Sequence, residues 1–273
     1  MARPPSARWI GMRADLTAVL APFQPGKVAL LHSGRCGSEL LGSLLGSNPR
    51  LHWAGEFVNE QVYPLLDPPG DYAGRLAGRI GIPLQVALSS RGWKARGRIQ
   101  VVKTKRLHFA AAGIDTPAEA SRILDQAGLT RRIVLSRRNS LHALLSWTRA
   151  LATRTPHAYR PEDVPTGTVR VPLDTIPTRL GLLPIEAALE LREQDAAWVD
   201  ETAGADALRL IYEDDLRDGY QDCIVRIADF LSIEPWKAET RTVRTGGQPL
   251  ERAIENFDAL VGRLSGTRWA SML

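Results

Sequence analysis

The segment SGRCGSEL, residues 33–40, has the residue types of an anion-binding loop. Two glycines, Gly34 and Gly37, allow a tight turn and a close backbone approach to a ligand. Arg35 adds a permanently charged, forked donor, and Ser38 adds a hydroxyl that is well placed to cap a following helix. Free N–H groups and the helix dipole favour negative charge at a helix N-terminus, so this pattern predicts a site for a phosphate-like group.

The same loop departs from common nucleotide-binding loops. The pattern G-x-x-x-x-G-K-[ST] is absent, so a standard magnesium-dependent ATPase or GTPase is not expected. Glu39 brings a carboxylate close to the expected anion, and we expect it to point outward while its N–H faces the ligand. Cys36 stands beside Arg35 at the helix start, where a lowered thiol pKa and easy oxidation are expected.

A second group of donors occurs in RRIVLSRRNSLHALLSW. Arg132–Leu135 is a predicted strand, and Asn139 opens a predicted helix. Ser146 lies eight positions after Arg138, a little over two helical turns, so the two side chains are expected to approach one face of that helix. A guanidinium and a hydroxyl directed at one point suit a second phosphate group.

Taken in order, these segments resemble the sulfotransferases that use 3′-phosphoadenosine 5′-phosphosulfate. Residues 35–40, RCGSEL, are similar to the motif R-[ST]-G-[ST]-[ST]-L, which binds the 5′-phosphosulfate in that family. Arg138, Asn139 and Ser146 match the residues that bind its 3′-phosphate. LRLIYEDDLRD resembles the Y-E-D segment, whose tyrosine, Tyr212 here, packs on the adenine.

Further segments extend the resemblance towards the C-terminus and towards particular branches of the family. TRTVRTGG resembles a basic, glycine-containing loop that closes on the 3′-phosphate and places Arg244 there. The Gly55-Glu56 pair is similar to one found in the bacterial carbohydrate-type and tyrosylprotein-type branches, and in the tyrosylprotein branch that glutamate is the proposed base. In the steroid branch a catalytic histidine follows the strand-end lysine by two positions, and here that position is Lys105.

The resemblance implies transfer of a sulfuryl group from 3′-phosphoadenosine 5′-phosphosulfate to a hydroxyl by in-line displacement, without a metal ion. The acceptor is expected to be a carbohydrate, a glycolipid or a natural product. Arg35 and Lys103 are the predicted catalytic cations and Glu56 the predicted base, ahead of His108 and His52. The predicted nucleotide-binding residues are Gly34, Arg35, Cys36, Gly37, Ser38, Arg138, Ser146, Tyr212 and Arg244.

Three other classes of protein stay open at this point. A nucleotide or small-molecule kinase shares the overall layout, although the lysine of the phosphate loop is missing. A nucleic-acid-binding module is suggested by the basic run 94–106, but no recognition motif occurs and aromatic residues are only 6% of the chain. A catalytically degenerate sulfotransferase-like protein is the third, because of Cys36 and Glu39.

These residues need a scaffold of strands that alternate with helices. Such alternation predicts an α/β fold, P-loop-like, with three layers and a central, mostly parallel sheet flanked by helices. Ligands in such folds bind outside the carboxyl ends of the strands. The predicted strands are 28–32, 99–102, 132–135 and 208–212, and the predicted helices are 38–47, 83–90, 118–127, 139–154, 185–201, 220–231 and 250–264.

Length and composition fit a single domain over 1–273. Residues 155–183 are rich in loop-forming types and are expected to form a surface excursion, whose part 159–171 is a candidate lid over the acceptor. The net charge of +5 favours anionic partners, and the two cysteines fit a reducing compartment. With no membrane span or signal peptide predicted, we expect a soluble, cytoplasmic protein. The sequence does not identify the acceptor molecule. It also leaves the oligomeric state open, with a homodimer among the options.

Overall fold

The computed structural model describes residues 26–56, 95, 97–110, 112–155, 157–243 and 248–273. Five parallel strands form the central sheet in the order β2-β3-β1-β4-β7. Their bounds are Lys27–His32 for β1, Leu51–Glu56 for β2, Ile99–Thr104 for β3, Arg131–Ser136 for β4 and Leu208–Ile211 for β7. The predicted α/β class and parallel sheet are confirmed.

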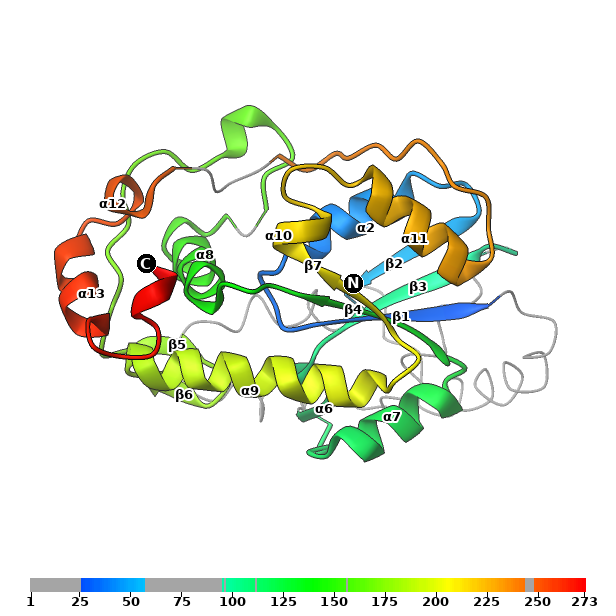
Figure 1. The fold of residues 1–273 in the computed structure, drawn as a ribbon, viewed down its shortest axis with the longest axis horizontal. Coiled ribbons are helices and arrows are strands. Elements are labelled where there is room, and N and C mark those ends of the chain that lie inside the picture. The colour runs from blue at the N-terminus through cyan, green and yellow to red at the C-terminus, as the bar shows by residue number, and fades with distance from the viewer. Residues whose placement is uncertain (1–25, 57–94, 96, 111, 156, 244–247) are drawn as a thin grey trace, which may run out of the picture.

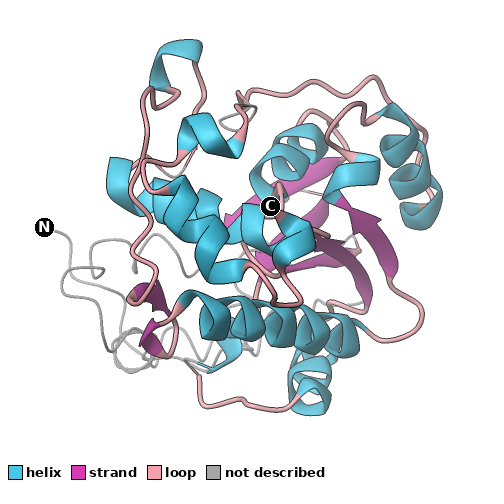
Figure 2. Ribbon diagram, turned by 60° about the vertical axis from the view of Figure 1, so that its left-hand side comes forward, coloured by secondary structure: helices cyan, strands magenta, loops and turns pink. Residues whose placement is uncertain are grey.

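Helices cover both faces of the sheet (Figures 1 and 2). Val28 and Leu30 of β1 pack with α2 (Ser38–Gly46) and α11 (Gln221–Leu231) on one face. Ala29 and Leu31 pack on the other face with α7 (Pro117–Gln126) and α9 (Ile185–Ala203). Alternate residues of β1 therefore serve the two faces, and this burial explains why the strand is a continuous apolar run.

A third apolar cluster lies beyond the carboxyl ends of the strands. It joins α8 (Ser140–Thr153), α9 and α13 (Phe257–Leu264), with Leu144, Leu189 and Leu260 at its centre. In Figure 1 α8 lies at the edge where β1 and β4 end, on the side at which ligands of such sheets bind. The short helices α6 (Arg106–Ala110), α10 (Tyr212–Asp215) and α12 (Leu250–Ala253) complete the described fold.

The predicted element bounds agree with the structure over most of the described chain, with four corrections. The strand β2 was not predicted, because LHWAGE lacks a β-branched run. The predicted helix 250–264 is interrupted, since α12 ends at Ala253 and α13 begins at Phe257. Part of the predicted excursion is ordered: an antiparallel hairpin joins β5 (Ile176–Thr178) to β6 (Gly181–Leu183). Gly37, not Ser38, occupies the N-cap of α2.

The predicted helix 83–90 lies outside the described residues. Within the described ranges, the structure contains no helix that combines the length and apolarity needed to cross a membrane.

Candidate functional site

The loop between β1 and α2 turns sharply and leaves the start of α2 open. Gly34, Arg35 and Gly37 have φ values of 83°, 51° and 86°, so a non-glycine residue holds the left-handed conformation between two glycines. No side chain caps the N-terminus of α2. Since the first N–H groups of a helix have no intrahelical partner, those of α2 are available to an anion.

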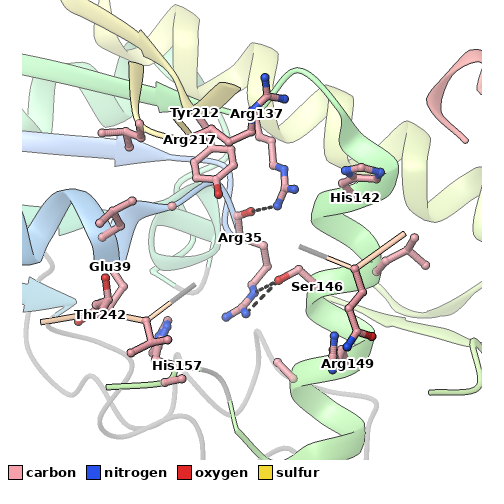
Figure 3. A pocket seen from close by; sticks show the side chains of 18 of the residues that line it. Arg35, Glu39, Arg137, His142, Ser146, Arg149, His157, Tyr212, Arg217 and Thr242 are labelled. Carbon is pink, nitrogen blue, oxygen red and sulfur yellow. Dashed lines mark hydrogen bonds between the residues drawn. The ribbon is translucent and has the colours of Figure 1, made fainter. Parts of the chain in front are cut away.

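Arg35 connects this loop to α8. Its Nε and Nη2 donate to Ser146 Oγ at 3.1 and 3.0 Å (Figure 3). The guanidinium of the first predicted anion site therefore lies against the hydroxyl of the second. The sequence predicted the two sites separately, and the fold brings the arginine of the first against the serine of the second.

Two further arginines hold the loop through its carbonyl groups. Arg137 Nη1 donates to the carbonyl oxygen of Arg35 at 3.3 Å, and Arg192 Nη2 donates to that of Gly34 at 2.8 Å. Burial lowers the pKa of Arg192 to about 10, yet its guanidinium stays charged at neutral pH. These hydrogen bonds occupy the carbonyl groups of the loop, and the arginines add positive charge around it. Both effects favour binding of an anion at the side of the loop where its N–H groups are exposed.

Tyr212 packs against the opposite side of the loop. A Cβ added at Gly37 would lie 2.6 Å from the Tyr212 ring, so only glycine fits this contact without movement. The Arg137 guanidinium lies 4.9 Å from the centre of the same ring. Arg137 thus connects the loop to Tyr212, and its Nε lies 3.6 Å from the Glu213 carboxylate.

These groups line a cavity of about 800 Å³. Its walls come from the loop and the start of α2, from α8, from the segment 212–220 and from the segments on either side of residues 244–247. Figure 3 shows Arg35, Ser146 and Tyr212 facing this space, with Arg149 on α8 beyond Ser146. The lining includes Arg35, Ser38, Glu39, Arg137, His142, Ser146, Arg149, His157, Tyr212 and Thr242. A cavity lined by several cations and by the rings of Tyr212 and Tyr220 suits an anionic, ring-containing ligand.

Arg138 is not brought to this cavity. Its side chain is 61% exposed and pairs with Asp214, so the expected approach to Ser146 does not occur in this structure. Asn139 caps α8 instead, and its Oδ1 accepts from His142 N at 2.8 Å. Arg138 precedes the N-cap residue Asn139 and so lies outside α8. The helical spacing used to predict that Arg138 and Ser146 share one face therefore does not apply to Arg138. The arginine that lines the cavity is the preceding one, Arg137.

Glu39 and Cys36 both differ from expectation. The Glu39 carboxylate lies in the cavity wall, where its Oε2 pairs with Lys103 Nζ at 2.9 Å, and does not point outward. Burial tends to raise its pKa, but Lys103, His157 and Tyr159 together lower it further than burial raises it, so the pKa is lowered. Cys36 is fully buried, and this burial raises the pKa of its thiol. The expected lowered thiol pKa is therefore wrong.

The remaining predicted residues fall into three groups. Gly34, Gly37 and Ser38 lie in the loop and at the start of α2, as expected. The side chain of Glu56 is outside the description, but its backbone ends β2 in register with Lys103. Arg244 lies outside the described residues.

Several cavity residues were missed by sequence reasoning or placed elsewhere. His142, which was not among the predicted site residues, lines the cavity, where burial lowers its pKa. Arg149 lies three residues after Ser146 on α8, and this spacing was the available signal. Arg192, which supports the loop through the Gly34 carbonyl but does not line the cavity, gave no local signal, because it lies in the middle of α9. The described residues hold no cluster of three or more His, Cys, Asp or Glu able to bind a metal ion.

Comparisons with known proteins give little beyond the fold. No model of a protein family matches the chain, and no curated protein matches it. Among solved structures it is similar to the sulfotransferase domain from the curacin biosynthetic pathway, with 14% identity and a TM-score of 0.41 over 91% of this chain and 89% of that chain. A likeness of this size carries no functional assignment, so function has to be argued from the residues of the site.

Proposed function

We propose that this protein is a sulfotransferase that uses 3′-phosphoadenosine 5′-phosphosulfate as sulfuryl donor and a hydroxyl as acceptor. The observation that carries the proposal is the contact between Arg35 and Ser146. Each belongs to a separate sequence motif for one end of this nucleotide, and their contact gives one cavity donors for two phosphate groups. Tyr212, beside the loop, is the proposed contact for the adenine ring.

The donor would lie with its 5′-phosphosulfate at the N-terminus of α2. Backbone N–H groups and Arg35 would bind that end. Ser146 would bind the 3′-phosphate together with Arg137 and Arg149, two of the arginines that line the same cavity. Arg244 remains a proposal from the sequence resemblance alone, and Arg138 would join the 3′-phosphate site only if its exposed side chain turned away from Asp214 into the cavity.

The chemistry requires charge stabilisation more than covalent participation by the protein. In a loose, in-line transfer, negative charge develops on the oxygen that leaves with the phosphate. Arg35 borders the cavity and Lys103 lies just behind Glu39, so these are the proposed cations. The resemblance implies Glu56 as the base, and its backbone lies beside that of Lys103. The Glu39 carboxylate, which pairs with Lys103, competes with Glu56 for that role.

Binding of the nucleotide is the direct test. Thermal unfolding is measured with 3′-phosphoadenosine 5′-phosphate, ATP and AMP at equal concentrations. A ligand that binds only the native state raises the melting temperature, and we expect the largest rise with the 3′-phosphorylated nucleotide. Equal shifts for the three nucleotides, or none, would contradict the proposal. A magnesium-dependent shift that is largest with ATP would instead favour a kinase.

A further inference from the structure

Glu39 is an acidic group in the wall of the cavity, next to the proposed chemistry. It is the second residue of α2, and its carboxylate lines the cavity beside the anion-binding loop. Lys103 lies behind it, because only 4% of the lysine side chain is exposed against 26% for Glu39. A ligand in the cavity therefore meets the carboxylate before it meets the ammonium.

The two oxygens of this carboxylate have different partners. Oε2 accepts from Lys103 Nζ at 2.9 Å, which fixes the orientation of the carboxylate. Oε1 accepts from the hydroxyl of Tyr159 at 3.2 Å. Tyr159 is 53% exposed and belongs to the segment after α8, whose neighbour Ala158 accepts a backbone hydrogen bond from Val243. A hydroxyl that donates to a fixed carboxylate oxygen has the geometry required for proton transfer to a base.

The charge states of both groups fit this arrangement. Burial opposes ionisation of Glu39, but Lys103 and the nearby His157 and Tyr159 lower its pKa, so it is a carboxylate at neutral pH. Burial and Glu39 raise the pKa of Tyr159 to about 12, so its hydroxyl keeps its proton. Movement of Lys103 towards a bound sulfuryl donor would remove the main cation from Glu39, and the carboxylate would become a stronger base.

We propose that Glu39 accepts the proton of the acceptor hydroxyl, and that the Tyr159 hydroxyl marks the place which the acceptor hydroxyl takes. This inference rests on the proposed sulfotransferase function. In the step, the acceptor oxygen forms a bond to sulfur and its proton passes to Glu39 Oε1. The bond between sulfur and the phosphate oxygen breaks, and its electron pair stays on the phosphate, where Arg35 and Lys103 face the new charge.

The test compares Glu39→Gln with the wild type and with Glu251→Gln. Glu251→Gln is the control, because it makes the same carboxylate-to-amide change on an exposed side chain of α12. Transfer from 3′-phosphoadenosine 5′-phosphosulfate is measured with 4-nitrophenol, N-acetylglucosamine and octanol, and the acceptor with the highest wild-type rate is used. Binding of 3′-phosphoadenosine 5′-phosphate is measured separately by calorimetry.

We expect Glu39→Gln to lower kcat by at least about 100-fold, the usual contribution of a general base, with nucleotide affinity retained. Glu39→Asp should recover part of kcat, and Glu251→Gln should match the wild type. If Glu39→Gln keeps the wild-type kcat, Glu39 is not the base. The same conclusion follows if Glu56→Gln loses turnover and Glu39→Gln does not. A wild-type protein without selective nucleotide binding or transfer overturns the proposed function itself, so the two failures are distinguishable.

If Glu39→Gln fails to fold, Tyr159→Phe tests whether the acceptor hydroxyl binds beside Glu39. Removal of a hydroxyl that occupies the acceptor's place should lower the acceptor KM and leave nucleotide affinity unchanged. An increase in that KM contradicts the placement.

Discussion

Arg35 and Ser146 stand 111 positions apart in the chain, yet the Arg35 guanidinium donates two hydrogen bonds to the Ser146 hydroxyl. The contact joins the loop after β1 to the middle of α8, and it brings one donor from each of the two predicted anion sites to the same cavity. A serine hydroxyl held by a cation is polarised, so it donates more strongly to a phosphate that arrives beside it.

Replacement of Ser146 by alanine should weaken binding of 3′-phosphoadenosine 5′-phosphate by about tenfold, the effect of one lost hydrogen bond to a charged group. AMP, which has no 3′-phosphate, should bind as it does to the wild type. Titration calorimetry with both nucleotides checks this. Ser265→Ala is the matched control, because that hydroxyl is exposed and bonds to Val261 O. Equal loss for both nucleotides would contradict a 3′-phosphate contact.

The two neighbouring arginines should differ in their effect on the nucleotide. Arg137→Ala removes a cation that lines the cavity, holds the Arg35 carbonyl and lies over Tyr212, so affinity should fall by about 10- to 100-fold. Arg138→Ala removes an exposed side chain paired with Asp214 and should change affinity by less than about threefold. The dissociation constants of the two variants are compared directly. A larger loss in Arg138→Ala would show that the arginine turns into the cavity when ligand binds.

The glycines of the loop should differ in their tolerance of a side chain. Gly34 and Gly37 both have positive φ, so alanine at either position costs about 1–2 kcal/mol of backbone strain. The Cβ at Gly34 meets nothing within 4 Å, whereas the one at Gly37 meets the Tyr212 ring at 2.6 Å. Gly37→Ala should therefore lose more stability in urea than Gly34→Ala. Equal losses would indicate that Tyr212 moves aside without cost.

The ion pair of Glu39 with Lys103 should make stability depend on pH. The pKa of Glu39 is lowered in the folded state, so its contribution is present above about 4.5 and is lost as pH falls through the folded value. Glu39→Gln should lower the free energy of unfolding by about 1–3 kcal/mol at pH 7, because it leaves a buried ammonium without its carboxylate. The difference from the wild type should shrink as pH falls below about 4.5. Urea titrations at pH 7 and pH 3.5 measure it, and a constant difference would contradict this account.

The two cysteines should be unreactive in the folded protein. Burial raises the pKa of Cys36, and it raises that of Cys223 to about 12, so both thiols are protonated at pH 8. Since the thiolate is the reactive form, iodoacetamide should label neither cysteine in the native protein and both in urea. Mass spectrometry counts the labels. Rapid native labelling of Cys36 would contradict its burial.

Much of the scaffold follows from the sequence, for local reasons. Apolar runs such as Val28–His32 mark buried strands, and Asn139 marks the start of α8 through its capping side chain. The β1–α2 loop follows from its glycines, which permit the left-handed backbone that the turn requires. The strand β2 escaped prediction because its stability comes from pairing with β3, which no local pattern records.

The directions of the side chains were decided only by the tertiary structure. Arg137 and Arg138 are adjacent and identical in type, and the fold directs one to Tyr212 and the other to Asp214. Glu39 follows helix rules that permit an outward carboxylate, but Lys103 at the end of β3 attracts it into the cavity wall. Sequence determines which residues stand near each strand end. The packing of distant elements determines which of them meet, because long-range contacts fix the rotamers that local propensity leaves open.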